Sequence, residues 1–106
     1  MTDQEIPHSE KFRIIAKRWV DADSAANMLE ETKTSILAKR MADLGDMPVS
    51  RAEMTIKASD EWHEYIRSMV DARTKASLLK VQKEFILMQF HEWQSHEASR
   101  RAEMKL

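Results

Sequence analysis

The segment Gly45–Ser50, with the sequence GDMPVS, decides the fold, because it holds the only glycine of the chain and one of its two prolines. Gly45 can adopt the left-handed backbone conformation that ends a helix, and Pro48 is a second helix-breaking residue three positions later. On both sides of this segment the chain consists mainly of residues that favour helix. The sequence therefore predicts two helices joined by a turn at residues 45–49.

The helix before the turn is predicted to span residues 9–44 approximately. Pro7 disfavours helix in the residue that precedes it, and the hydroxyl of Ser9 can cap the helix that follows. We therefore expect residues 1–8 to form a flexible leader and residues 9–106 to form a single helical domain.

The helix after the turn is predicted to span residues 50–104 approximately. Ser50 and Glu53 in the sequence SRAE match a capping box, in which each side chain accepts from a free backbone N–H of the first turn. No glycine or proline follows, so we expect one long helix with a bend near Ser59. The alternative is a break, with Ser59 or Asp60 capping a new helix.

Apolar residues recur along both predicted helices at alternating spacings of four and three, which is the pattern of a coiled-coil seam. In the first helix the seam positions are Phe12, Ile15, Trp19, Ala22, Ala26, Leu29, Lys33 and Ile36. In the second helix they are Trp62, Tyr65, Met69, Ala72, Ala76, Leu79, Lys83, Ile86, Phe90 and Trp93. We predict an all-α protein, an antiparallel helical hairpin that resembles a coiled coil. The two seam lysines either set the register or mark places where the seam is open to water.

The predicted helices differ in length, so the hairpin should leave part of the second helix uncovered. In an antiparallel pair, positions whose numbers add to about 95 face each other, which places Trp19 near Ala76 and Ala26 near Met69. The first helix then ends opposite residue 85 or so, and roughly 20 residues, about 30 Å of helix, remain without a neighbour. The apolar run Glu84–Trp93, with the sequence EFILMQFHEW, begins at that point.

An exposed apolar patch of this size on a small protein is typical of an interface. Burying each of its large side chains is worth roughly 1.5 to 3 kcal/mol. We predict that Ile86, Leu87, Phe90 and Trp93 mediate self-association, with a two-fold dimer that forms a four-helix bundle favoured. Two alternatives remain open. Another register or a bend could bury the run within one molecule, or a different protein could bind it.

Composition excludes several classes of function. Charged residues make up 33% of the chain, but the net charge is only −1, so no long-range field attracts nucleic acid or an anionic membrane. The absence of cysteine excludes disulfides and thiolate metal sites and fits a reducing compartment. No signal-peptide pattern and no run of ~20 apolar residues is present. We expect a cytoplasmic protein without membrane association.

Candidate catalytic motifs fail on spacing. His91 and His96 in HEWQSHE are five residues apart, so ~140° of rotation separates them on a helix and they cannot share one metal ion. The pair Asp60 and His63 occurs once and lacks the inward-facing glutamates of a di-iron bundle. A single glycine allows no phosphate-binding loop. We therefore predict no catalytic residue, no metal site, no cofactor and no enzymatic activity.

Basic residues gather at the end of the chain, where Arg100, Arg101 and Lys105 are opposed only by Glu103 in SRRAEMKL. Cations at a helix C-terminus complement the helix dipole, which explains them without a ligand. A two-fold dimer would nevertheless duplicate this basic end. Nucleic-acid contact through these three residues is therefore the alternative to a purely protein-binding role.

The segment Val70–Met104, VDARTKASLLKVQKEFILMQFHEWQSHEASRRAEM, resembles small helical proteins encoded by bacteriophages and prophages. These proteins share an alanine-rich helix followed by an aromatic-Glu-Trp motif and an Arg-Arg-Ala-Glu-Met ending. The resemblance covers the last third of the chain and implies a phage or prophage origin, with the host-cell cytoplasm as the compartment. Because most such proteins have no known function, it provides no catalytic residues.

The sequence as a whole favours a non-enzymatic interaction or structural protein that self-associates and has a host or phage protein as a further candidate partner. The alternative is an accessory nucleic-acid-binding protein in phage DNA replication or recombination.

Overall fold

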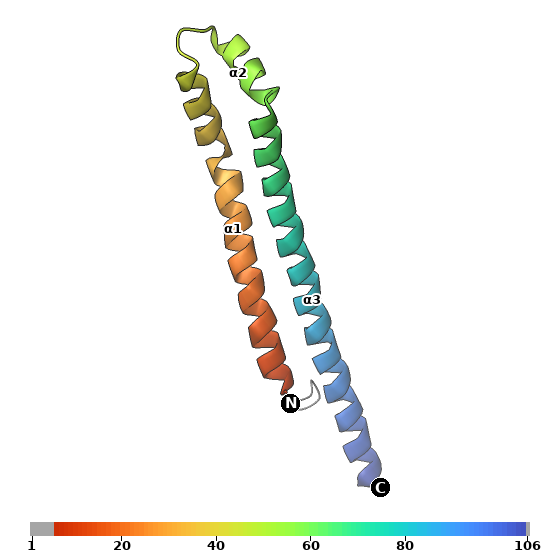
Figure 1. The fold of residues 1–106 in the computed structure, drawn as a ribbon. Helices are drawn as coiled ribbons and strands as arrows, with labels where there is room; N and C mark the ends of the chain where they lie inside the picture. The colour runs from red at the N-terminus through yellow and green to blue at the C-terminus, as the bar shows by residue number, and fades with distance from the viewer. Residues whose placement is uncertain (1–5, 106) are drawn as a thin grey trace.

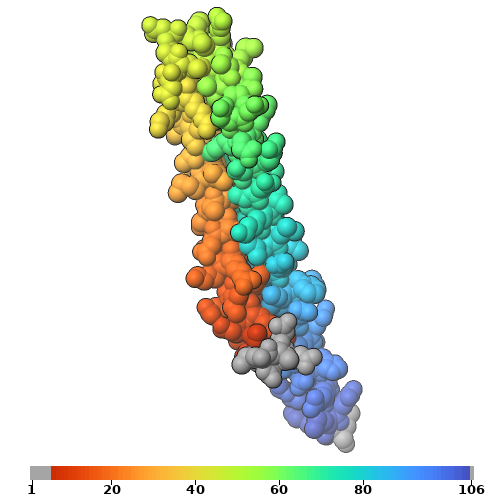
Figure 2. All heavy atoms as spheres, in the orientation of Figure 1, coloured from red at the N-terminus to blue at the C-terminus, as the bar shows by residue number. Residues whose placement is uncertain are grey.

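The computed structural model describes residues 6–105 and contains three helices, α1 (His8–Asp43), α2 (Val49–Lys57) and α3 (Asp60–Met104). Figure 1 shows α1 running antiparallel to the other two helices, with the end of α3 extending past the start of α1. The molecule measures 84 × 27 × 17 Å and forms a rod two helices thick (Figure 2). No strand occurs among the described residues. The predicted all-helical class is therefore confirmed.

The turn after α1 forms at the predicted glycine. Gly45 has a φ of +80°, and its N–H donates to the carbonyl oxygen of Ala42 at 3.1 Å. A residue with a Cβ would be strained in this left-handed conformation. The single glycine of the chain therefore ends the first arm.

Both helices that follow a proline begin without a side-chain cap, which corrects two predictions. The residues in the N-cap positions of α1 and α2 are Pro7 and Pro48, and neither helix has a side-chain cap hydrogen bond. Ser9 lies inside α1 and Ser50 inside α2, because each helix starts directly after its proline, where the ring already fixes a helix-compatible φ. Of the predicted leader, residues 1–8, the first five lie outside the described residues, and His8 already belongs to α1.

The capping box predicted at the start of the second arm is also wrong. Glu53 pairs with Lys57 one turn further along, at 2.7 Å. An exposed pair of this kind contributes little to stability. The proline therefore starts α2, and Glu53 has no part in the cap.

The second arm is interrupted, so the single helix predicted over residues 50–104 is wrong and the alternative of a cap at Ser59 is correct. Ser59 has extended backbone angles, and its hydroxyl accepts from the N–H of Trp62 at 3.2 Å. Asp60 and Glu61 follow in the first turn of α3, where acidic groups favour the positive end of the helix dipole.

The break has a physical reason, which is a change of phase in the apolar pattern. Continuing the four-and-three spacing backward from Trp62 would place Ala58 and Thr55 on the face toward α1. The buried residues there are Ala52 and Ile56 instead. Two residues outside the helix, Ala58 and Ser59, shift the phase so that Ile56 and Trp62 both face α1.

The predicted seam is confirmed by the burial pattern. Every predicted seam residue is buried or half-buried except Trp93, which is about half exposed. The buried core consists of Ile15, Ala22, Ala26, Ala52, Ile56, Trp62 and Ala76. Ala26 and Ala76 are 0% and 1% exposed, so small side chains let the two backbones approach closely. α1 and α3 form most of the interface.

Toward the start of α1, the pairing of α1 with α3 differs from the prediction by about one helical turn. Trp19 lies against Lys83 and His8 against Phe90, whereas the sequence placed Trp19 near Ala76. Figure 1 shows that the connection rises past the end of α1 before α2 starts. Trp19 and His8 therefore face residues several positions further along α3 than predicted. The pairs Leu29–Tyr65 and Asp23–Arg73 lie close to the predicted pairing.

Replacing Ala26 by Leu should destabilise the fold by about 1–3 kcal/mol, because the added atoms have no space between the close-packed helices. Ala38→Leu, at an exposed position of the same helix, is the matched control and should change stability little. Urea unfolding followed by circular dichroism at one protein concentration measures both variants. Equal midpoints for the two variants would show that the helices do not approach closely at Ala26.

Candidate interaction surface

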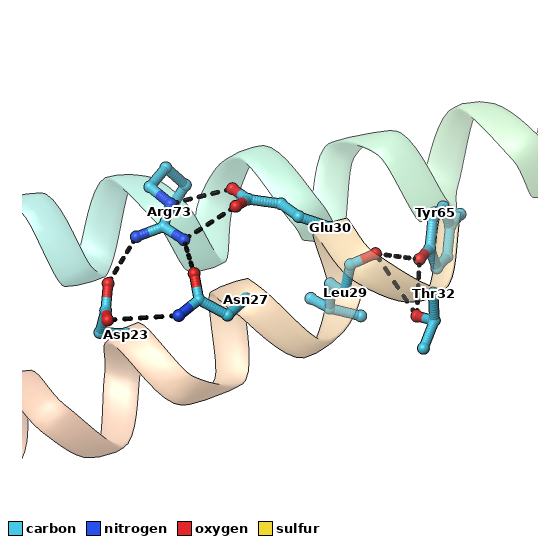
Figure 3. Close-up of polar contacts among 7 residues, drawn as sticks. All are labelled: Asp23, Asn27, Leu29, Glu30, Thr32, Tyr65 and Arg73. Carbon is cyan, nitrogen blue, oxygen red and sulfur yellow. Dashed lines mark hydrogen bonds and ion pairs between the residues drawn. The ribbon is translucent and has the colours of Figure 1, made fainter. Parts of the chain in front are cut away.

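A polar clasp joins the two arms at mid-length, where Arg73 of α3 binds three side chains of α1 (Figure 3). Its guanidinium donates to Asp23 at 2.7 Å and to Asn27 at 2.5 Å. Two further bonds, from Nε and Nη2, reach the two oxygens of Glu30 at 2.9 and 2.8 Å. This two-bond pairing with Glu30 fixes direction as well as distance. The clasp therefore defines the register of α1 on α3.

The charges of the clasp stabilise one another. Hydrogen bonds from Arg73 hold the pKa of the Glu30 carboxyl below its ordinary value. The same bonds to Glu30, followed by those to Asp23, raise the pKa of Arg73 further above its already high value. All three side chains are partly exposed, so salt and solvent screen their attraction. The clasp therefore contributes mainly by selecting one alignment.

A second polar contact lies two helical turns from the clasp, at Tyr65 (Figure 3). Its hydroxyl donates to the backbone carbonyl of Leu29 and lies 3.2 Å from the hydroxyl of Thr32. Thr32 in turn donates to the carbonyl of Met28 at 2.7 Å. Tyr65 is a seam residue, so its ring packs between the helices while its polar end finds a partner.

The seam lysine of α3 has a defined partner. The ammonium of Lys83 lies 4.0 Å from the centroid of the Trp19 ring, which is cation–π geometry. This contact accounts for a charged residue at a half-buried seam position. Of the two roles that the sequence left open for this lysine, setting the register agrees with the contact.

The start of α1 covers part of the apolar run, which corrects the predicted length of the overhang. The ring of His8 lies 5.7 Å from that of Phe90 and 5.5 Å from that of Trp93. His8, Ser9 and Phe12 of α1 line a small apolar cavity of about 150 Å³ together with Ile86, Leu87 and Phe90. Cover therefore extends to about Trp93 and does not end at residue 85, because the register is shifted by about one turn.

The four residues predicted to mediate self-association fall into two groups. Ile86 and Phe90 face α1 and are half-buried, whereas Leu87 and Trp93 are each more than a third exposed. Only the part of α3 after Trp93 extends beyond α1, and it carries no large apolar side chain except Met104. The exposed apolar surface therefore lies alongside the hairpin and not beyond its end.

A stripe of exposed apolar residues, which the sequence analysis did not identify, runs along the side of α3 that faces away from α1. Leu78, Val81, Phe85 and Met88 are 61%, 62%, 57% and 58% exposed. We call these four residues the outer stripe. Their spacing of three, four and three is itself a seam pattern, offset by two positions from the seam toward α1. This offset spacing was the signal in the sequence. It was hard to recognise because the outer stripe and the seam toward α1 overlap in one apolar run.

The clasp residues also escaped the sequence analysis. Asp23, Asn27 and Glu30 repeat the four-and-three spacing one position after the seam of α1, which places them at its edge. The predicted pairing, in which facing positions add to about 95, already places Arg73 beside Asp23. The opposite charges at the edge of the seam were therefore the signal in the sequence.

The three basic residues at the end of α3 are exposed and lie beyond α1. Arg100 pairs with Glu97 one turn earlier, at 3.7 Å. Arg100 and Arg101 lie in the last turn and a half of α3, and Lys105 follows directly after it.

The other motifs singled out in the sequence are the pairs His91 with His96 and Asp60 with His63. Among residues 6–105, no three His, Asp or Glu side chains gather in a way that could hold a metal ion. None of the described helices is long and apolar enough to cross a membrane.

Comparison of the chain with protein families, with curated proteins and with solved structures gave no match.

Replacing Arg73 by Met should reduce the acid sensitivity of the fold. The pKa of Glu30 in the folded state lies below its ordinary value of 4.5, so its ionised form stabilises the fold above that pH. This stabilisation is lost as the pH falls through the folded-state pKa. The midpoint temperature of thermal unfolding, measured between about pH 7 and about pH 3, should therefore fall less steeply with decreasing pH for the variant than for the wild type.

Arg67→Met is the control for this experiment, because Arg67 pairs with Glu64 within α3 at 2.9 Å and does not join the two arms. It should leave the wild-type pH dependence nearly unchanged. Identical pH profiles for Arg73→Met and the wild type would show that the clasp adds no pH-dependent stability.

Proposed function

We propose that this chain is a non-enzymatic interaction or structural protein that self-associates through the C-terminal part of α3. The observation that carries the proposal is the concentration of exposed apolar side chains there. Phe85, Leu87, Met88 and Trp93 are all at least 41% exposed within about two and a half turns of helix. Exposed clusters of this kind on small proteins mark contact surfaces.

Association would supply the burial that the hairpin lacks. Among the described residues no large side chain is fully buried, and small domains of this size are only marginally stable when they stand alone. A dimer that covers the apolar part of α3 brings four long helices together and adds hydrophobic burial to each copy. A two-fold pair closes on itself and leaves no copy of the surface exposed.

The surface chemistry supports binding and not catalysis. The clasp, the tyrosine contact and the cation–π pair all hold the two arms together. The resemblance of the last third of the chain to phage-encoded helical proteins is the support for placing the role in a phage or prophage within the host cytoplasm. A host or phage protein would then be the further partner of the assembly.

Light scattering tests the proposal directly. The chain has a mass of 12.4 kDa, and the wild type should approach about twice that mass as its concentration rises, because dimerisation follows mass action. A mass that stays at the monomer value over the whole concentration range would overturn the proposal.

A nucleic-acid role through Arg100, Arg101 and Lys105 predicts a different result. A labelled duplex or single strand would bind with an affinity that falls steeply with salt, and replacing the three residues by Ser would abolish binding. Fluorescence anisotropy measures this. We expect no such salt-dependent binding, because the basic end is small and the net charge of the chain is −1.

A further inference from the structure

We infer that the partner of the outer stripe is the outer stripe of a second copy, with the two α3 helices antiparallel and centred near Lys83. This inference rests on the self-association proposed above and adds the face, the direction and the register. It also assigns the contact to residues other than those that face α1.

The position of the outer stripe on α3 comes first in the argument. Each of its residues lies two positions from a seam residue, a rotation of ~200°, so it points directly away from α1. The stripe is about 15 Å long and is exposed along its whole length. No other described part of the chain packs against that side. A helix with apolar seams on opposite sides requires a neighbour on each.

The spacing of the stripe is self-complementary in the antiparallel direction. When two copies are centred near Lys83, Leu78 of one copy meets Met88 of the other, and Val81 meets Phe85. The Val81–Phe85 layer pairs a smaller side chain with a larger one, and the Leu78–Met88 layer pairs two of similar volume. Every layer occurs twice by symmetry. The four residues therefore form a closed set of contacts with no apolar residue left over.

The charges beyond the stripe favour this direction over the parallel one. Continuing the seam spacing outward from the stripe reaches Arg67 and Asp71 on one side and Glu92 on the other. In a parallel pair each of these charges would meet its own copy, which is unfavourable. In the antiparallel pair they meet small hydroxyl residues of the second copy, namely Ser99, Ser95 and Thr74 respectively.

The antiparallel direction also brings unlike ends together. The segment with Arg100, Arg101 and Lys105 then runs beside the start of the second copy's α3, which carries Asp60, Glu61 and Glu64. Like-charge approaches remain at Glu84, which lies near its own copy at the flank of the stripe, and where Arg100 and Glu103 lie one position from the levels of Arg67 and Glu64 of the second copy. All of these side chains are exposed, so solvent and salt screen their repulsion.

The resulting assembly differs from a bundle with one central core. The stripe and the seam toward α1 lie on opposite sides of α3, so the four helices stand in a row, with the two copies of α3 in the middle. The α1 helices lie on the outside.

Three aspartate variants test this face: one on the outer stripe, one on the side toward α1 and one control on α1. Phe85→Asp should weaken dimerisation by at least about a hundredfold, because each dimer carries the change twice at a buried layer. It should leave the helical content intact, since Phe85 is exposed in the monomer. Trp93 lies on the side of His8, so Trp93→Asp should leave the mass unchanged. The Met28 side chain is exposed on α1, and Met28→Asp should also leave the mass unchanged.

Crosslinking tests the direction, and the absence of cysteine in the chain leaves only the introduced thiols to react. With a short bismaleimide, Gln82→Cys should link to its own copy near the two-fold axis. Ser77→Cys and His91→Cys should each fail to link alone and should link when the two variants are mixed. All three positions are exposed.

Each outcome decides between the two proposals. A dimer in which Ser77→Cys links to itself is parallel and overturns the register. A dimer that survives Phe85→Asp but is lost in Trp93→Asp uses the side toward α1, which overturns this inference and leaves the proposed self-association standing. A wild type that is monomeric throughout overturns both.

Discussion

The packing of α1 on α3 along one seam is the interaction on which the structure depends, because a rod of two helices offers each helix only one intramolecular neighbour. Every buried residue of the part of the chain that the structure describes lies there or in the short contact with α2. The close approach at Ala26 and Ala76 is therefore significant. Small residues bring the backbones together, and larger residues at other seam positions fill the space on either side.

Contacts of three different kinds along the seam agree on a single alignment. The clasp at Arg73, the hydroxyl of Tyr65 on the Leu29 carbonyl and the ammonium of Lys83 over Trp19 each join positions far apart in sequence. An apolar seam alone tolerates a slip of one heptad, since the pattern repeats. Directional contacts do not tolerate it, because each would lose its partner. Polar residues at the edge of the seam thus supply specificity, and the apolar residues supply most of the burial.

The sequence was sufficient to predict the helices, the glycine that ends the first arm and nearly every seam position, because these follow from local preference and from spacing. It was not sufficient to predict the register, which depends on how the chain between Leu44 and Pro48 travels before α2 begins. The length of the overhang depends on that register and therefore remained out of reach. The predicted pairing does place Arg73 beside Asp23, so that contact of the clasp was accessible from the sequence. The break before Asp60 could be recognised only as an alternative, since Ser59 is compatible with either a bend or a cap. The spacing of the outer stripe is present in the sequence, but the seam toward α1 runs through the same segment and obscured it.

α3 extends for 45 residues without an interruption, and in the proposed pair this length acts as a spacer. The two-fold axis lies near Lys83, whereas the connecting turn of each copy lies near residue 46, so the two turns would stand about 110 Å apart at opposite ends of the assembly. Anything attached to those turns would be held at a fixed separation. Such a rigid rod could act as a spacer of defined length between two binding partners, which a compact bundle of the same mass could not do.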